Sequence, residues 1–279
     1  MVGPLQGKVV AVTGAGRGIG AATAAAAARS GAKVAIGDVD TASAEATAAS
    51  LGGSEQGVIA LPLDVTDQTG FVAFLDEVEN RLGPLDVLVN NAGIMPLARL
   101  LDEDDEVTGR MLEINVRAMI RGTREAVRRM QPRGSGHVVN IASTAGKAGL
   151  PGASTYGATK AAMVTFCEAV RLELRGTGID VTAVLPGIVR TELAVGVPDL
   201  RGMSAVTPEA VADGIVEALV RPRAEVYVPA HAGPLINSAR LMPRRMGEWI
   251  SRRIGADRVF LDALERPERA AYERRATHS

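Results

Sequence analysis

The chain has one cysteine, Cys167, and three histidines, His137, His231 and His278, among its 279 residues. A single cysteine excludes an internal disulfide, and the scattered histidines lack the spacing of a metal-ligand set. We therefore predict no metal site. Cys167 follows the apolar register of a predicted helix, which favours a buried thiol over a nucleophile.

Aromatic residues make up only 3% of the chain, and no basic patch is interleaved with them. Base-stacking platforms need aromatic side chains, so nucleic acid is not an expected partner. No apolar run approaches the ~20 residues that span a bilayer, and the N-terminus lacks the blocks of a secretory signal. We expect a soluble, cytoplasmic protein without a transmembrane segment.

The hydrophobic fraction of 47% and the formal net charge of −1 are typical of a chain with a large buried core. The length allows one large domain or two small ones. We favour a single catalytic domain over residues 1–230, followed by a helical extension over 231–279 that packs on the domain or on a neighbouring subunit.

A glycine-rich turn follows the first predicted strand, residues 8–12, and precedes an alanine-rich helix that ends near Ser30. Glycine allows positive φ and close approach of a ligand to the backbone, and the N-terminus of a helix attracts phosphate. The turn is therefore a candidate site for a dinucleotide pyrophosphate. Its residues in this role are Gly14, Gly16, Arg17, Gly18, Ile19 and Gly20.

Asp38 ends the second predicted strand, residues 33–37, eighteen residues after Gly20. An acid at about this distance binds the adenosine ribose hydroxyls and disfavours a 2'-phosphate. We therefore expect NAD, with NADP a weaker alternative because Arg17 could pair with such a phosphate. The other interpretation is that Asp38 only begins the turn into the helix near Thr41.

Strands alternate with helices along the chain, which indicates βαβ units and a parallel sheet covered on both faces. The fold class is therefore α/β, a Rossmann-type doubly wound fold with a seven-stranded, mostly parallel sheet. The remaining predicted strands span 58–63, 85–89, 136–142, 181–185 and 225–228, and the helices 41–51, 66–82, 102–131, 156–175 and 207–220. Asp38, Asp64, Asn90 and Ser143 fall at the carboxyl ends of strands, where such sheets bind ligands.

Tyr156 and Lys160 lie four residues apart on a predicted helix, so they share one face. An ammonium beside a phenol favours the phenolate, whose ordinary pKa of ~10 is too high for proton transfer at neutral pH. Ser143 adds a hydroxyl that can hold a substrate oxygen. Asn115 lies inside a helix, where asparagine is unfavourable, so a functional role and polar packing are both open.

Together these residues resemble the short-chain dehydrogenase/reductase family, over about residues 5–229. The motifs are Thr13-Gly14-x-x-x-Gly18-x-Gly20, Asp64, Asn90-Asn91-Ala92-Gly93, Asn115, Ser143, Tyr156-x-x-x-Lys160 and Pro186-Gly187 through Thr191. The resemblance implies that Tyr156 is the general acid/base, Ser143 holds the substrate oxygen, Lys160 tunes the tyrosine and binds the nicotinamide ribose, and Asn115 supports a proton relay. It implies cofactor contacts by Asp64, Val65, Asn91, Ala92, Gly93, Tyr156, Lys160, Pro186, Gly187, Ile188 and Thr191.

We therefore expect an NAD-dependent oxidoreductase acting on a secondary alcohol or ketone. Its predicted substrate pocket is mostly apolar, which favours a lipophilic substrate; its walls are Ile94, Met95, Ala145, Leu150 and Leu193, with the segment to Val206. Epimerisation or dehydration with the same cofactor, and NAD sensing without turnover, are alternatives. A homodimer or homotetramer is the expected assembly.

The extension carries apolar residues at helical spacing, namely Leu241, Met242, Met246, Trp249, Ile250 and Ile254, among arginines 240, 244, 245, 252 and 253. An apolar stripe of this kind needs a partner surface. The extension could cap the substrate cleft or a subunit interface, lie on a membrane surface as a basic amphipathic helix, or be a mobile end.

Overall fold

The computed structural model describes residues 3–200, 204–239 and 242–278. Leu241, Arg240 and part of the 193–206 wall therefore lie outside the described residues. Within them the strands form one seven-stranded sheet in the order β3-β2-β1-β4-β5-β6-β7, with every neighbouring pair parallel. The strands are β1 (Val9–Thr13), β2 (Lys33–Asp38), β3 (Val58–Pro62), β4 (Val87–Asn90), β5 (Gly136–Ile141), β6 (Ile179–Pro186) and β7 (Glu225–Val228).

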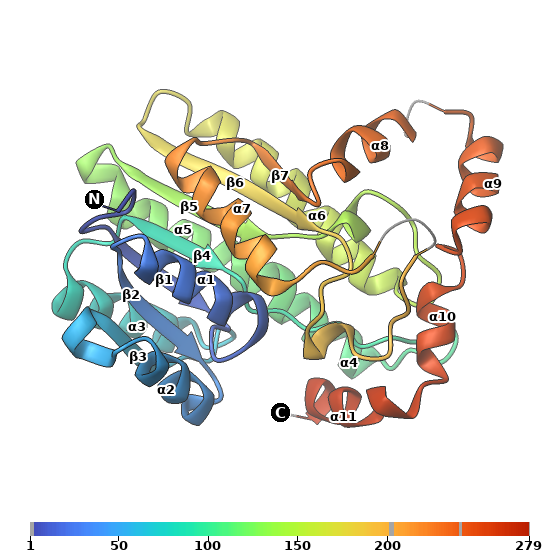
Figure 1. Cartoon of the computed structure of the whole chain (residues 1–279), viewed down its shortest axis with the longest axis horizontal. Helices are drawn as coiled ribbons and strands as arrows, with labels where there is room; N and C mark the ends of the chain where they lie inside the picture. The colour runs from blue at the N-terminus through green and yellow to red at the C-terminus, as the bar shows by residue number, and fades with distance from the viewer. Residues whose placement is uncertain (1–2, 201–203, 240–241, 279) are drawn as a thin grey trace.

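Helices cover both faces of the sheet (Figure 1). One buried cluster joins the sheet to α3, α5 and α6, and a second joins its other face to α1, α2 and α7. The described α-helices are α1 (Gly18–Arg29), α2 (Thr41–Ser50), α3 (Gln68–Leu82), α4 (Asp105–Leu112), α5 (Met119–Met130), α6 (Ser154–Glu173), α7 (Pro208–Val220), α8 (Ala232–Ala239), α9 (Arg244–Ile254), α10 (Val259–Leu264) and α11 (Ala270–His278). The predicted Rossmann-type α/β fold is thus confirmed.

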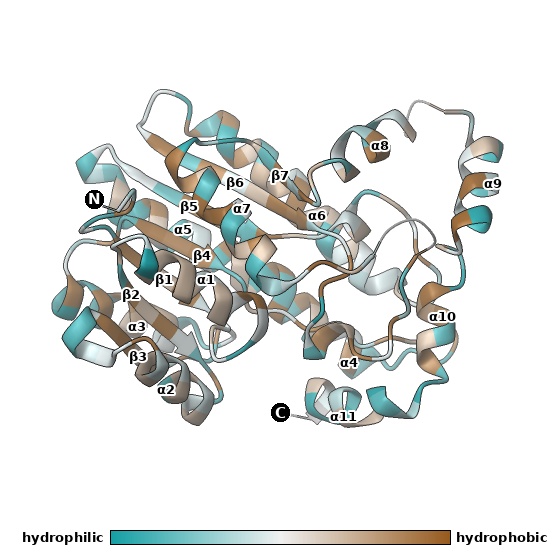
Figure 2. Ribbon diagram, in the orientation of Figure 1, coloured by the Kyte–Doolittle hydropathy of each residue, from teal (hydrophilic) through white to brown (hydrophobic). Residues whose placement is uncertain are grey.

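The strands read as continuous apolar runs because both of their faces are buried. All five residues of β1 are buried, and Figure 2 shows hydrophobic strands between helices whose outer sides are more polar. The chain order of the strands reverses between β1 and β4, which are neighbours in the sheet. A crevice beyond the carboxyl ends of the strands is the usual ligand site at such a reversal.

The predicted single helix over 102–131 is interrupted. It begins at α4, whose N-cap Asp104 accepts hydrogen bonds from the backbone of Glu106 and Val107. A π-helical turn, Glu113–Ala118, then separates α4 from α5. Insertions of this kind often occur at functional sites, and this one holds Asn115.

The extension after residue 230 forms α8 to α11, at the right-hand end of the sheet in Figure 1. Val259, Phe260 and Ala263 of α10 are buried in a third apolar cluster, which also contains Tyr156 and Met95. The distal part of the extension therefore packs against the region that carries the predicted active site.

We predict that Leu88→Ala lowers the free energy of unfolding by about 2–5 kcal/mol, because it removes a fully buried side chain from the central strand β4. Leu172→Ala is the matched control on α6, where the side chain is 50% exposed, and should change stability by about 0.5 kcal/mol or less. Urea denaturation of both variants measures the difference. Equal effects would contradict the assignment of Leu88 to the core.

Candidate active site

A cavity of about 1420 Å³ opens at the carboxyl ends of the strands. Most predicted cofactor and substrate residues line it: Gly14, Arg17, Gly18, Ile19, Asp38, Asp64, Val65, Asn91, Ala92, Gly93, Ile94, Met95, Ser143, Ala145, Leu150, Tyr156, Lys160, Pro186, Gly187, Ile188, Thr191 and Leu193. Gly16, Gly20 and Asn115 do not line the cavity and lie behind its wall. The fold therefore brings segments from the whole length of the chain to one space.

The glycine turn has the backbone geometry that its sequence predicts. Gly14 and Gly18 have φ of 60° and 57°, values that residues with a side chain rarely adopt. A Cβ on Gly20 would lie 2.3 Å from the carbonyl oxygen of Gly14, so only glycine allows α1 to start this close to β1. Asn91 secures the turn by donating its side-chain amide to the carbonyls of Thr13 and Gly14, at 2.9 and 2.8 Å.

Asp38 forms the turn that leads into α2 and also lines the cavity. Its carboxylate accepts the backbone N–H of Gly16 at 2.8 Å, which ties β2 to the glycine turn. It also accepts the N–H of Asp40 at 2.9 Å and so forms the turn that leads into α2. Because Asp38 still lines the cavity, it can also face a ligand there. Gly16 has a packing role, since a Cβ would lie 2.9 Å from the Asp38 carboxylate.

Arg17 is held by acids on both sides of the cavity mouth. Its guanidinium contacts Asp40 beside α2 and Glu192 in the segment after β6, the latter at 3.1 Å. Glu192 also contacts Arg275 of α11. These ion pairs connect the glycine turn, the 190s segment and the C-terminal helix across the cavity.

Asp64 follows β3 and is exposed at the far end of the cavity. Its carboxylate accepts both the backbone N–H and the hydroxyl of Thr66, at 2.8 and 2.7 Å. Among the described residues, no group of three or more His, Cys, Asp or Glu side chains could hold a metal ion.

Asn115 is fully buried and joins three segments of the site. Its side-chain oxygen accepts the backbone N–H of Ile94, and its amide donates to the Ile94 carbonyl, both at 2.9 Å. The amide also donates to the Thr159 hydroxyl, at 3.2 Å. Asn115 therefore links the segment after β4 to α6, which explains a polar side chain inside a helix.

Tyr156 is buried in the cavity wall, 7% exposed. Burial raises the pKa of Tyr156 to about 12, whereas hydrogen bonding to Ser143 and the charge of Arg269 oppose this rise. The Ser143 hydroxyl is positioned by the backbone, because it accepts the N–H of Ala145 at 3.1 Å. The phenol and the serine hydroxyl therefore lie together, as the sequence predicted.

Lys160 is as buried as Tyr156, and its ammonium lies 5.7 Å from the centre of the tyrosine ring. It donates to the carbonyl of Ile141, at 2.8 Å, and not to the phenol. Burial lowers the pKa of Lys160 to about 8. The sequence predicted that Lys160 favours the phenolate, but in this structure the loss of hydration dominates the pKa of Tyr156.

The cavity has a further wall whose residues the sequence analysis did not assign. Val259 and Phe260 of α10 and Tyr272 of α11 line it together with the predicted Met95 and Leu150. Tyr272 accepts the backbone N–H of Met95 at 2.8 Å, which attaches α11 to the segment after β4. The apolar pattern that the sequence analysis described lies over residues 241–254, so it gave no signal for these wall residues.

Arg269 is a buried arginine that sequence reasoning missed, and its side chain is 2% exposed. Its guanidinium donates to the carbonyls of Leu193 and Val195, at 3.1 Å each, and to the carbonyl of Met95. It also pairs with Glu273, at 2.6 Å, one helical turn later. This i,i+4 spacing resembles an ordinary surface pair, so the sequence contained no signal of burial.

We predict that Arg269→Met loosens this wall and lowers the free energy of unfolding by about 3 kcal/mol, because it leaves backbone carbonyls and Glu273 without their donor. Hydrogen exchange should become faster in residues 193–197 and 267–277. Arg258→Met is the matched control, since the Arg258 side chain is 76% exposed. Unchanged exchange in Arg269→Met would show that the arginine does not hold the wall.

The sequence profile described as short chain dehydrogenase matches residues 8–200. The chain is 34% identical over 260 residues to the "Probable oxidoreductase EphD" of Mycobacterium tuberculosis, covering 85% of this chain and 44% of that protein. It therefore spans less than half the length of that relative.

For two further relatives, the match covers similar shares of this chain and of the relative. The "Ketoacyl reductase HetN" of a Nostoc species is 33% identical, with 88% of this chain and 85% of that protein covered. The "3-alpha-(or 20-beta)-hydroxysteroid dehydrogenase" of Mycobacterium tuberculosis is 37% identical, covering 71% and 75%.

A crystal structure of a short chain dehydrogenase/reductase from Burkholderia phymatum, in complex with NAD, has the same fold. Its TM-score is 0.77 at 24% identity, with 84% of this chain and 93% of that chain covered. The fold, the cavity and the match over most of the sequence lead to one conclusion: this chain belongs to the short chain dehydrogenase family.

Proposed function

We propose that the protein is an NAD-dependent oxidoreductase that transfers hydride between the nicotinamide and a secondary alcohol or ketone. The observation that carries this proposal is the burial of Tyr156 and Lys160 side by side, in the same cavity as the glycine turn. A protein that only binds a dinucleotide has no need of a buried phenol beside an ammonium at the substrate end.

The residues present fit a dinucleotide. The cavity of about 1420 Å³ exceeds the ~300–1,000 Å³ of a typical small-molecule pocket, so it has room for a cofactor and a substrate. The N-terminus of α1 opens into it at Gly18 and Ile19, where free N–H groups and the helix dipole favour a pyrophosphate. Asp38 and Asp64 would hold the adenosine end, and Lys160 and Thr191 the nicotinamide end.

The ion pairs of Arg17 support NAD over NADP. Binding a 2'-phosphate would require Arg17 to exchange its contacts with Asp40 and Glu192 for the new anion, in a region that also contains Asp38. The carboxylates of Asp38, Asp40 and Glu192 disfavour a further negative charge beside Arg17. A ribose with free hydroxyls can instead donate hydrogen bonds to Asp38.

The chain's own residues supply the proton transfer and the positioning, while the nicotinamide accepts or gives the hydride. In alcohol oxidation the Tyr156 oxygen removes the proton of the substrate hydroxyl, and the Ser143 hydroxyl holds the same oxygen. Lys160 stabilises the negative charge that develops on the phenol, at short range in a buried site. Asn115 holds the segment at Ile94 and the helix α6 in fixed relative positions. The proposed proton relay would run past Asn115.

The apolar side of the cavity supports a lipophilic substrate. Residues after β4, from α4, between β5 and α6 and from α10 form one apolar cluster around Tyr156: Met95, Leu97, Met111, Ala145, Ala153, Val259, Phe260 and Ala263 are its other buried members. The relatives named for hydroxysteroid and ketoacyl substrates are consistent with this preference. The assembly as a homodimer or homotetramer stays a prediction.

We predict that Tyr156→Phe lowers turnover by ~100-fold to 10,000-fold while the fold and cofactor affinity are kept, because only the transferable proton is removed. Turnover is followed by the absorbance of reduced nicotinamide with a panel of secondary alcohols, and cofactor affinity by calorimetry. Tyr227→Phe, on β7, is the matched control. If Tyr156→Phe kept more than about a tenth of the activity with chemistry rate-limiting, the mechanism would be wrong.

We also predict that kcat/KM favours NAD over NADP by roughly 5-fold to 1000-fold, from the repulsion of about 1–4 kcal/mol between Asp38 and a 2'-phosphate at ~4 Å. Asp38→Asn with Val39→Arg should shift the ratio toward NADP, since Val39 is 69% exposed at the cavity. Val39→Arg alone is the control that keeps the carboxylate. A wild-type preference for NADP would refute the assignment.

A further inference from the structure

The helix α9 presents apolar residues away from the rest of the protein. A groove of about 940 Å³ separates it from the 145–151 segment and α6, and Glu248, Ser251 and Arg252 form the α9 side of this groove. By helical spacing, Met246 and Trp249 point away from the groove, and they are 45% and 57% exposed. An amphipathic helix usually buries its apolar stripe against its own domain, so this orientation needs an external partner.

The same helix is locally cationic although the whole chain has a formal net charge of −1. Residues 240–258 contain six arginines and two acids. Arg245, Arg252 and Arg253 are exposed, and the Arg253 guanidinium lies 5.4 Å from the centre of the Trp249 ring. In the described part of the chain, no carboxylate lies within ion-pair distance of these three arginines.

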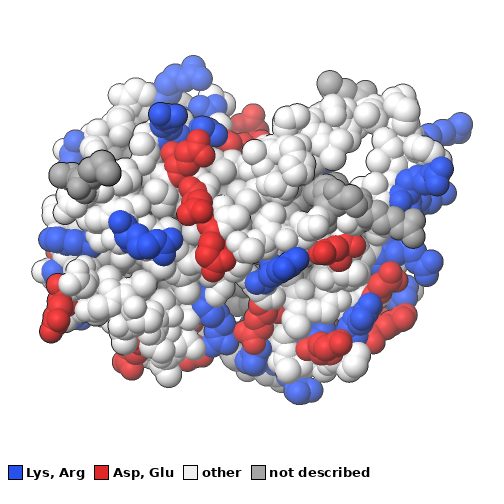
Figure 3. Space-filling model, viewed as in Figure 1, with Lys and Arg blue, Asp and Glu red and all other residues white. Residues whose placement is uncertain are grey.

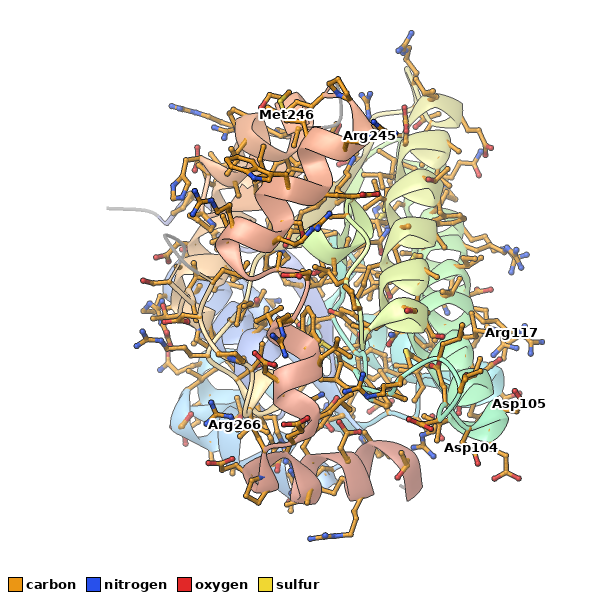
Figure 4. All side chains as sticks on the ribbon, turned by 90° about the vertical axis from the view of Figure 1, so that its right-hand side faces the viewer. Asp104, Asp105, Arg117, Arg245, Met246 and Arg266 are labelled. Carbon is orange, nitrogen blue, oxygen red and sulfur yellow. The ribbon has the colours of Figure 1, made fainter. Side chains whose placement is uncertain are left out.

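The exposed apolar and basic side chains of α9 lie at one end of the molecule. Figure 3 shows basic side chains at the edge where α9 lies, and acidic ones nearer α10. Figure 4 shows Arg245 and Met246 at the end of α9 that is farthest from α11. Leu235 of the neighbouring α8 is also 53% exposed. The surface is therefore accessible to a large, flat partner.

We propose that α9 docks onto an anionic lipid surface, with Trp249 and Met246 at the headgroup boundary and Arg245 and Arg253 on lipid phosphates. Interfacial helices combine an apolar face with arginines in this way, and tryptophan prefers the membrane–water boundary. A symmetric dimer through α9 is disfavoured, because the arginines of one copy would lie opposite the arginines of the other copy across the two-fold axis. A nucleic acid would match the arginines but would leave Met246 without an apolar partner.

The docked helix leads directly into the substrate wall. Ile254 ends α9, and Val259 and Phe260 of the next helix line the cavity. A lipophilic alcohol dissolved in the bilayer would thus reach the cavity along α10, a consequence that rests on the proposed function. No helix in the described ranges is long and apolar enough to cross a membrane, so α9 would lie on the surface.

Trp249 makes the docking directly measurable, because it is the only tryptophan of the chain. Full-length protein is mixed with vesicles of phosphatidylcholine alone or of phosphatidylcholine with phosphatidylglycerol. We expect co-sedimentation with the anionic vesicles, a blue shift of the tryptophan emission, and loss of both in high salt. Neither signal requires turnover, so failure of docking and failure of the proposed enzymatic activity can be distinguished.

The charge-removing variant replaces Arg245 and Arg253 with glutamine, because Arg252 lies on the groove side of α9. It should lower vesicle affinity on the order of 25-fold, because each arginine near an anionic surface contributes about fivefold. The matched control makes the same replacement at Arg29 and Arg171, two exposed arginines outside the extension, and should keep the affinity. A second variant, Met246→Ser, keeps Trp249 as the reporter and should weaken the blue shift.

Three results would overturn the proposal. These are the absence of a blue shift with anionic vesicles, equal loss of affinity in the two arginine variants, and a change in oligomeric mass on α9 substitution without any vesicle binding. The last would identify α9 as a contact between copies of the chain. Light scattering in the absence of vesicles measures that mass.

Discussion

The hydrogen bonds between Asn115 and Ile94 are the constraint on which the arrangement of the site depends. They join the helical layer to the segment after β4, and the third bond of Asn115, to Thr159, fixes α6 relative to both. Because Asn115 is fully buried, its amide has no water to replace these partners. The π-helical turn at this position is the local deformation that lets one side chain satisfy all three contacts.

Burial then determines the chemistry that the site can perform. Tyr156 and Lys160 shift in opposite directions, to a pKa of about 12 and about 8, because each loses hydration of its charged form. The two pKa values therefore move apart, so burial favours the neutral phenol of Tyr156 and the neutral amine of Lys160.

The C-terminal extension has two parts with different surroundings. The helices α10 and α11 complete one wall of the cavity through Val259, Phe260 and Tyr272, and Arg269 attaches them to backbone from two other segments. In contrast, α9 keeps a groove between itself and the domain and exposes Trp249. One segment of chain thus contributes a wall of the cavity and also carries an outward surface.

The sequence alone was sufficient for the fold class and the order of the strands along the chain, and most of the residues that it predicted for the site line the cavity. Local patterns determine these features: apolar runs for buried strands, glycines where only positive φ or close approach fits, and Tyr156 and Lys160 four residues apart on a helix. Such signals need no knowledge of distant contacts. For the interruption of the predicted 102–131 helix, the only indication in the sequence was Asn115, an unfavourable residue inside a helix.

Tertiary structure alone decided the roles of Arg269, Arg17 and Asp38. Arg269 and Glu273 have the spacing of a surface pair, and only the packing of this segment against residues 193–195 removes Arg269 from water. Arg17 finds Glu192 across 175 positions of chain, a partner that no local pattern indicates. The direction in which α9 faces was undecided for the same reason: amphipathicity specifies that a helix has an apolar side, whereas the rest of the fold determines whether that side meets protein or solvent.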